Sequence, residues 1–195
     1  MPSDELRLFV AIELNDEVRE ALGWLQAELR SRGLEKLRWV RPEGIHLTLK
    51  FLGETPAQKV PLIQEVLVSA VEAAPAHELA LGAIGTFGGK NPRVLWIDLK
   101  GDLDVMLGLQ ERADSALAEI GFPRERRKFA PHLTLARVRP EIAHEMAGPL
   151  AHAIRTAEPP TATVAVREVS LMRSILGPGG VVYERIAVFP LGPSP

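Results

Sequence analysis

Two short segments of the sequence are identical and contain residue types that carry out acid–base chemistry. Residues 46–49 and 132–135 both read His-Leu-Thr-Leu. Residues two apart on a β-strand point to the same face. Each segment is therefore expected to place its histidine and threonine on one face and its two leucines on the other. We expect the leucines to pack in a core and the His/Thr face to meet a ligand.

The repetition is improbable by composition and has a regular spacing. A chain with these numbers of histidine and threonine should contain about 0.2 His-x-Thr pairs, whereas two are present with leucine between them. The two histidines are 86 residues apart, and so are Arg7 and Arg93, which begin two apolar segments. We interpret this as an internal duplication of a strand–helix–strand unit. The expectation is a single domain, residues 1–195, made of two interleaved lobes.

His46 and His132, brought together by such a duplication, would form an acid–base pair near neutral pH. A neutral imidazole can remove a proton and a protonated one can supply a proton. Thr48 and Thr134 can donate hydrogen bonds to an anion between the histidines. In-line opening of a phosphodiester needs this set, with a base on the attacking water and an acid on the leaving oxygen. The residues alone leave the two histidine roles interchangeable, and they require no metal.

Basic residues gather around both motifs. The segment Phe122–Arg139 has six basic residues and one acidic residue, or +5, in a chain whose formal net charge is −2. The basic residues near the first motif are Arg38, Arg41 and Lys50. Such a local patch suits a substrate that carries phosphate, although a solvated surface loop would have a similar composition. Arg137, three residues beyond Thr134, is expected to reach the cleft.

Hydrophobic periodicity and turn residues predict alternating strands and helices. The expected strands are Arg7–Leu14, Leu37–Arg41, Ile45–Leu52, Glu78–Ile84, Arg93–Leu99, Phe129–Val138, Ala162–Met172 and Val181–Pro190. The first helix is expected after an Asn15 or Asp16 cap, and the second from Thr55–Pro56 to about Ala74, with Leu62, Val66 and Ala70 on one face. A third helix is expected after Asp102. A fourth is expected over Glu141–Ala157, interrupted at Gly148–Pro149. Trp24, Trp39 and Trp96 are assigned to the core.

The composition excludes several classes of protein. The chain has 195 residues and no cysteine, so it has no disulfide, no thiol nucleophile and no Cys-ligated zinc. It contains no apolar run near the roughly 18 residues of a membrane span, and Met1–Asn15 does not resemble a signal peptide. We expect a cytoplasmic protein with no membrane association and no obligate protein partner.

Four ordered blocks of the sequence resemble the 2H phosphoesterase superfamily, and within it the family of RNA 2′,3′-cyclic phosphodiesterases, also called 2′-5′ RNA ligases (LigT/ThpR-like). The opening block reads RLFVAIEL, the two motif blocks read WVRPEGIHLTLKFLGE and FAPHLTLARV, and the closing block reads SILGPGGVVYERIAVFPL. The resemblance implies an α+β, bilobal fold with two pseudo-symmetric lobes, each with an antiparallel sheet and outer helices, around a central cleft.

The resemblance also implies an activity and residue roles. RNA or nucleotide 2′,3′-cyclic phosphate would be hydrolysed to a 2′-phosphate without a cofactor or metal. His46 would be the proton donor and His132 the proton acceptor, while Thr48 and Thr134 would hold the phosphate. The RNA partner would be a tRNA-like fragment or a cyclic nucleotide, and reversible ATP-independent 2′-5′ joining would be a secondary activity. Further candidate substrate contacts are Arg137, Arg41, Phe51 and Tyr183.

Two other functions remain open. One is a non-catalytic module that binds RNA or nucleotides, although such a module would be expected to lose a motif histidine. The other is a metal-dependent hydrolase with His46 and His132 as ligands, although no further histidine or carboxylate with ligand spacing accompanies them. The remaining histidines, His77, His144 and His152, are interpreted as surface or boundary residues.

Overall fold

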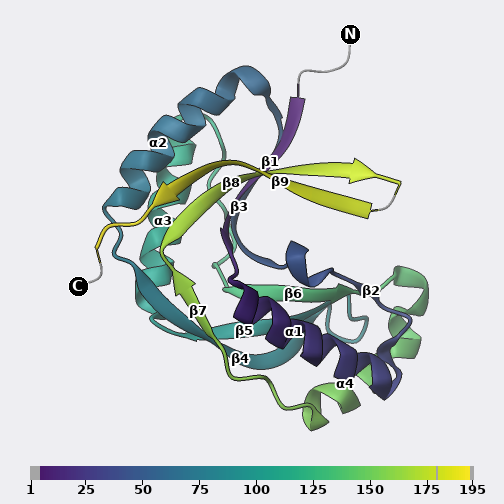
Figure 1. The fold of residues 1–195 in the computed structure, drawn as a ribbon. Coiled ribbons are helices and arrows are strands. Elements are labelled where there is room, and N and C mark those ends of the chain that lie inside the picture. Colours follow the sequence, from purple (N-terminus) through teal and green to yellow (C-terminus); the bar gives the residue numbers. More distant parts are fainter. Residues whose placement is uncertain (1–4, 179, 194–195) are drawn as a thin grey trace.

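The computed structural model describes residues 5–178 and 180–193, so the first four residues of the Met1–Asn15 segment lie outside the described part. These residues form two antiparallel sheets covered by helices (Figure 1). The first sheet has the order β3 (His46–Pro56), β1 (Glu5–Glu13), β8 (Glu168–Gly177), β9 (Gly180–Pro190). The second has the order β2 (Arg38–Trp39), β6 (His132–Arg137), β5 (Val94–Gly101), β4 (His77–Phe87), β7 (Thr163–Val166). The expected α+β fold with two antiparallel sheets is confirmed.

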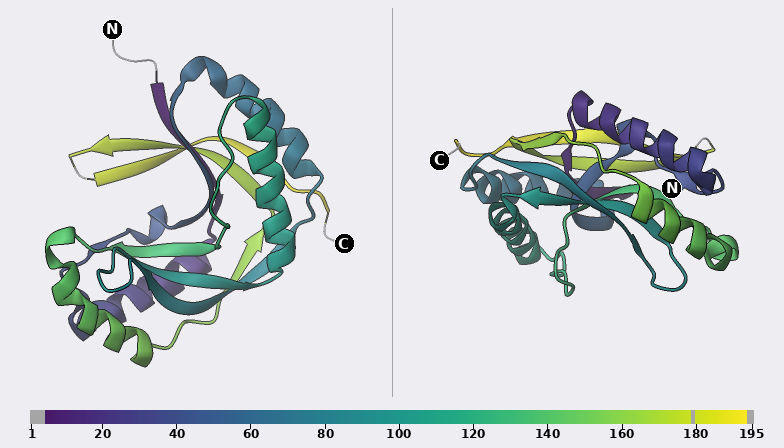
Figure 2. Two further views of the ribbon diagram at one scale, coloured as in Figure 1. Left: turned by 180° about the vertical axis from the view of Figure 1, so that it is seen from behind. Right: turned by 90° about the horizontal axis from the view of Figure 1, so that it is seen from below.

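Four α-helices of the described residues pack on these sheets, and two of them cross between sheets. They are α1 (Asp16–Leu29), α2 (Val60–Glu72), α3 (Leu103–Glu119) and α4 (Ala143–Thr156). Helix α1 follows a strand of the first sheet but lies along the second, whereas α3 follows a strand of the second sheet but contacts β3 of the first (Figures 1 and 2). The two strand–helix units are thereby interlocked.

Two buried glutamines connect these crossing helices to the motif strands. Gln26 of α1 donates to the carbonyls of Val40 and Leu135, at 2.8 and 3.0 Å. Gln110 of α3 donates to the carbonyl of Leu49 at 3.5 Å. Leu49 and Leu135 are the last residues of the two HLTL segments, so each helix bonds to the motif strand of the other half. The bonds satisfy polar groups that would otherwise be buried without partners.

The alternation expected for the HLTL segments is present. All four leucines are buried in the main hydrophobic core, while both histidines and both threonines are partly exposed. Strands β3 and β6 contact each other at the junction of the two sheets. The two His/Thr faces therefore lie on neighbouring strands and both point away from the core.

The second helix begins later than the sequence predicts, because a strand occupies its expected start. Thr55 and Pro56 were expected to begin it, but β3 pairs with β1 as far as Pro56 opposite Glu5, and the Thr55 side chain is buried. The helix consequently begins at Val60, and its buried face is shifted by one residue from the predicted one. The structure buries Ile63, Leu67 and Val71 and leaves Leu62 exposed.

Four other expectations are wrong because tertiary contacts override local signals. Helix α4 continues through Pro149, since one face of it packs into the core on both sides of the proline. The single strand expected over Ala162–Met172 is divided between β7 in the second sheet and β8 in the first. Trp24 is 72% exposed on α1 and Trp96 is only partly buried, whereas Trp39 is partly buried and packs against the core. His77, expected at the surface or boundary, is buried.

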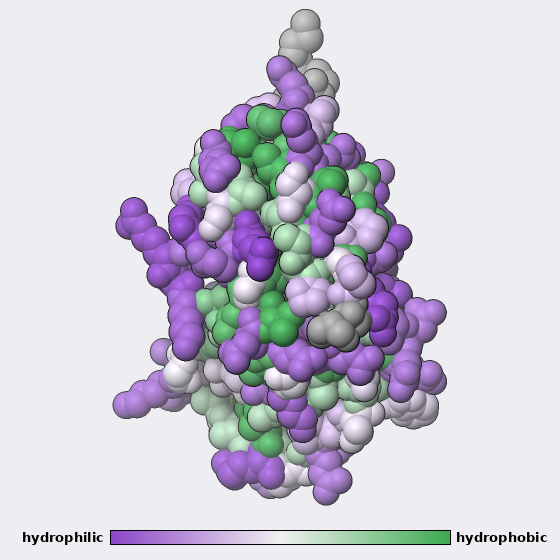
Figure 3. Space-filling model, turned by 90° about the vertical axis from the view of Figure 1, so that its left-hand side faces the viewer, coloured by the Kyte–Doolittle hydropathy of each residue, from purple (hydrophilic) through white to green (hydrophobic). Residues whose placement is uncertain are grey.

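The outer surface is mixed in character. On the side of the molecule shown in Figure 3, hydrophilic side chains predominate and smaller apolar areas lie between them. No helix within the described residues has the length and apolar character needed to cross a membrane.

Candidate active site

His46 lies at the start of β3 in an aromatic surround. Its Nδ1 is 2.9 Å from the Gly44 carbonyl oxygen, so Nδ1 carries the proton of that hydrogen bond when the ring is neutral and Nε2 is the atom left for chemistry. Phe9 stacks on the imidazole with ring centroids 4.8 Å apart, and Tyr183 meets it edge-on at 5.0 Å. The ring orientation is therefore held by one hydrogen bond and two aromatic contacts.

Burial lowers the pKa of His46 below its usual value. The hydrogen bond to the Gly44 carbonyl and the negative charge of Glu13 oppose this effect, and the positive charge of Arg137 adds to it. The net shift is downward, so the neutral imidazole is favoured in the free protein near pH 7. Arg137 is on β6, the strand of the second motif, which contacts β3.

His132 is built in the same way at the start of β6. Its Nδ1 is 2.7 Å from the Ala130 carbonyl oxygen, again two residues earlier in the chain. Phe87 and Trp96 meet the ring edge-on, with centroids 4.9 and 6.4 Å away. Both motifs thus use a carbonyl at position i−2 to orient the histidine, leave Nε2 available, and pack aromatic rings beside it.

The two threonines occupy matching places. Thr48 is paired with Ala11 across β1, and Thr134 is paired with Trp96 across β5. Both side chains are partly exposed on the same strand face as the neighbouring histidine. Their hydroxyl groups can donate to an anion bound beside the imidazoles.

A carboxylate faces each histidine across the neighbouring strand, and the sequence analysis did not single out either one. Glu13 is the partner of His46 in the β1–β3 register, and Asp98 is the partner of His132 in the β5–β6 register. The two acidic residues are 85 residues apart, within one residue of the repeat offset, so aligning the two halves could have found them. Glu13 accepts hydrogen bonds from Ser170 at 2.7 Å and Arg185 at 2.6 Å.

The expected substrate contacts are distributed unevenly around the histidines. Tyr183 contacts the His46 ring directly. Phe51 is 72% exposed and lies beside Phe9, with ring centroids 6.2 Å apart. Arg41 is exposed immediately before the short helical turn Pro42–Gly44, and its carbonyl accepts the Gly44 N–H.

Two of the basic residues that were assigned to the patch form ion pairs with acidic residues of α3. Lys50 is almost fully buried and forms an ion pair with Asp114, and its Nζ also donates to the Pro123 carbonyl at 2.6 Å. Arg124 pairs with Glu111 and Asp114 on α3. The interpretation of Lys50 as a surface charge is therefore wrong, because α3 supplies a buried carboxylate at that point. Besides Arg124, the exposed basic residues of the segment Phe122–Arg139 are Arg126, Arg127, Lys128, Arg137 and Arg139.

The described residues contain no group of three or more histidines, cysteines or carboxylates arranged to hold a metal ion. The chemistry that this arrangement offers is that of two oriented imidazoles, two hydroxyls and nearby guanidinium groups.

The sequence matches the LigT-like phosphoesterase family over residues 12–96 and 102–183. The chain belongs to this family.

Curated relatives and solved structures are similar to this protein over nearly the full chain. The RNA 2′,3′-cyclic phosphodiesterase of Thermotoga maritima is 33% identical over 182 residues, which is 92% of each chain. The enzyme of the same name from Methanothermobacter thermautotrophicus is 30% identical over 96% of this chain and 100% of its own. The structure of E. coli LigT complexed with 3′-AMP superposes with a TM-score of 0.76 at 27% identity, covering 96% of this chain and 98% of that one.

Proposed function

We propose that this protein hydrolyses 2′,3′-cyclic phosphate ends of RNA or nucleotides to 2′-phosphates by acid–base catalysis with two histidines and without a metal. The observation that carries the proposal is the shared construction of His46 and His132. Each has its Nδ1 hydrogen-bonded to a backbone carbonyl and its Nε2 left available, on two strands in contact at the junction of the sheets. The names of the relatives above support the substrate class.

In the proposed reaction, the neutral imidazole of His132 removes a proton from water, whose oxygen attacks phosphorus. The bond from phosphorus to the 3′ oxygen breaks, and protonated His46 supplies that oxygen with a proton. Thr48 and Thr134 donate hydrogen bonds to the non-bridging oxygens. The product carries its phosphate on the 2′ oxygen.

The acid role of His46 depends on the bound substrate. In the free protein burial favours its neutral form, but a phosphodiester anion beside the ring stabilises the imidazolium. His46 therefore gains its proton as substrate binds. Arg137 and the other exposed arginines can attract the phosphate but oppose protonation, so their main contribution is to substrate affinity.

The test is turnover of 2′,3′-cyclic AMP with EDTA present and identification of the product by chromatography. We expect 2′-AMP, and we expect His46→Ala and His132→Ala each to lower kcat about 10²–10⁴-fold. His152→Ala, which removes an exposed histidine on α4, is the matched control and should leave the rate unchanged. Undiminished activity in either motif variant would contradict the mechanism.

The other outcomes distinguish the alternatives. Loss of activity in EDTA would indicate a metal-dependent hydrolase, and a 3′-phosphate product would show that the 2′ oxygen is the leaving group. Tight binding of the cyclic nucleotide with no turnover would indicate a non-catalytic binding module. A secondary 2′-5′ joining activity is proposed as the same reaction with a ribose hydroxyl in place of water.

A further inference from the structure

A pocket of about 420 Å³ lies on the second sheet, and its lining includes Asp98, the partner of His132 on the neighbouring strand. Its lining includes Asp98 and Lys100 of β5, Ala80 of β4, and Thr161 on the segment that leads into β7. The residues that alternate with Asp98 and Lys100, Ile97 and Leu99, are buried in the core. The pocket therefore opens on the face of the sheet that carries His132 and Thr134, one strand away from them.

Asp98 is held in this pocket by an irregularity of β4. The β4–β5 pairing shifts between Leu81 and Ile84, and the backbone N–H of Ala83 in this bulge donates to Asp98 Oδ1 at 2.5 Å. A Cβ atom on Gly82 would come within 1.9 Å of the same oxygen. A side chain at position 82 would force the carboxylate to move, so the bulge and the glycine together allow Asp98 to lie over β4.

The polar groups of the pocket match a nucleoside. Among the hydrogen bonds of the described residues, those to the Asp98 carboxylate involve Oδ1, which leaves Oδ2 to accept N–H donors of a base. Lys100 is exposed and supplies a positive charge and N–H donors for a base carbonyl or a phosphate. The volume is in the range of sites that bind small organic ligands.

The position of the pocket indicates which nucleoside it would take. Neighbouring strands are about 4.8 Å apart, so a base placed over β4 and β5 lies within one nucleoside length of the His132 ring on β6. Under the proposed function His132 activates the attacking group. A nucleoside in this pocket is therefore on the side of the nucleophile and not on the side of the leaving oxygen.

We infer that this pocket binds the nucleoside whose 5′-hydroxyl replaces water in 2′-5′ joining, and the inference rests on the proposed function. In this reaction His132 takes the proton of the 5′-hydroxyl and the 5′ oxygen bonds to phosphorus. The bond from phosphorus to the 3′ oxygen breaks, and His46 protonates that oxygen. The product is a 2′-5′ phosphodiester, and the reverse steps cleave it to a 2′,3′-cyclic phosphate and a free 5′-hydroxyl.

The experiment compares two substrates on the same variants. One is the 2′-5′ dinucleoside monophosphate of adenosine and guanosine, with adenosine on the 2′ side, which fills both positions. The other is 2′,3′-cyclic AMP, which leaves the pocket empty. Asp98→Asn removes the negative acceptor, Lys100→Ala removes the cation, and Ala80→Leu narrows the pocket while keeping both polar side chains.

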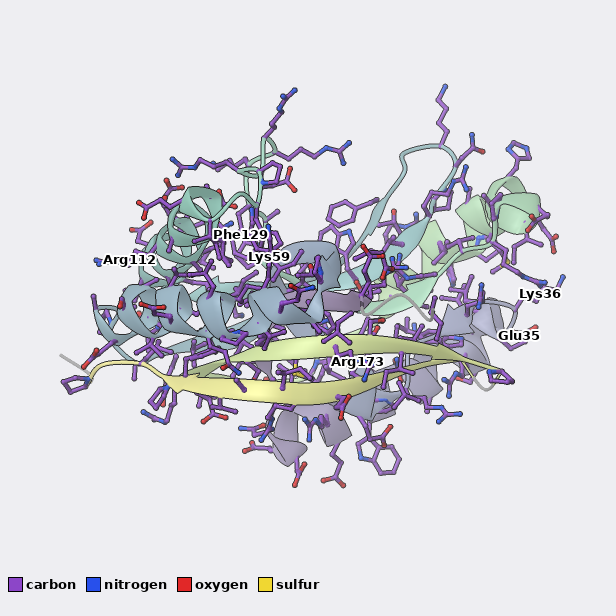
Figure 4. The ribbon with its side chains drawn as sticks, turned by 90° about the horizontal axis from the view of Figure 1, so that it is seen from above. Glu35, Lys36, Lys59, Arg112, Phe129 and Arg173 are labelled. Carbon is purple, nitrogen blue, oxygen red and sulfur yellow. The ribbon has the colours of Figure 1, made fainter. Side chains whose placement is uncertain are left out.

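Each pocket variant is expected to raise KM for cleavage of the dinucleotide about tenfold or more, since it loses a charged hydrogen bond or the space for the base. The ratio of kcat/KM values, dinucleotide to cyclic nucleotide, should fall by a similar factor. Lys36→Ala is the matched control, because Lys36 is exposed at the molecular edge and pairs with Glu145 on α4 (Figure 4). It should not change the ratio.

Three results would overturn the inference. The first is an equal loss on both substrates, which would mean that the residues act on the fold or on His132. The second is an unchanged ratio in all three pocket variants. The third is a wild-type protein that hydrolyses the cyclic nucleotide but neither forms nor cleaves a 2′-5′ bond. Failure of the wild-type protein to hydrolyse 2′,3′-cyclic AMP would instead refute the proposed function on which the inference rests.

Discussion

Replacing Lys50 with methionine is expected to lower the free energy of unfolding by about 3 kcal/mol or more. The side chains of Lys50 and Asp114 are each only 5% exposed. Removing the cation leaves the Asp114 carboxylate buried with only a 3.4 Å contact to Arg124 and a backbone N–H as compensation. Breaking a buried pair on one side costs about 3–5 kcal/mol, and we place this case at the lower end because Arg124 remains.

The replacement should also affect the chain segment that leads to His132. The Lys50 Nζ donates to the Pro123 carbonyl, so it connects the first motif strand to the segment that leads into the second. For a chain of this length, a loss of about 3 kcal/mol corresponds to a fall in Tm of about 6–12 °C. Denaturation in urea, followed by circular dichroism, would measure the loss directly.

The double variant Lys50→Met with Asp114→Leu provides the control. Replacing both members of a buried pair by apolar residues is often nearly neutral, so the double variant should recover much of the loss. Asp114 also makes the wild-type protein sensitive to acid. Burial alone would raise its pKa, but hydrogen bonds from Lys50 and the Glu125 N–H lower it overall. A lowered carboxyl pKa contributes stability that is complete above about pH 4 and is lost as the pH falls through the folded-state pKa.

Lys50→Met should therefore lose less stability than the wild-type protein on acidification below about pH 4. A loss of less than about 1 kcal/mol in the single variant would refute this prediction, since the pair would then contribute no more than a surface ion pair. A double variant less stable than Lys50→Met would refute it as well.

Two further predictions concern the buried glutamines and the partly exposed ring of His46. Gln26→Leu should lower the free energy of unfolding, measured in urea, by about 1–3 kcal/mol, because it removes two hydrogen bonds at a fully buried site. Gln110→Leu should lower it by less, because the single hydrogen bond of Gln110 is long. An equal loss in both variants would contradict this ranking. His46 has a lowered pKa in the folded state, so the unfolded chain binds its proton first and stability falls as the pH drops below about 6.5. His46→Asn should show a smaller loss of unfolding free energy between about pH 7 and 5, and an identical pH dependence in the two proteins would show that burial does not suppress protonation of this ring.

The motif strands and the faces they present can be predicted from the order of the amino acids alone. A period of two separates histidine and threonine from leucine, and the equal offsets of the motifs and strands predict the repeat. These features are local or depend on spacing along the chain, so they can be read without coordinates. The cap of α1, expected at Asn15 or Asp16, is local in the same sense, and the structure places it at Asn15.

Which groups surround the histidines, and which charges remain free, depends on contacts between residues far apart in the chain. Lys50 and Asp114 are 64 residues apart, and no local pattern indicates that one neutralises the other. The crossing of α1 and α3 between sheets places Gln26 and Gln110 against strands of the opposite half. Pairing with β1 extends β3 through Thr55–Pro56, whose residue types favour a helix start. In each case a long-range contact contributes more free energy than the local preference it overrides, and the partner in such a contact becomes known only when the chain is folded.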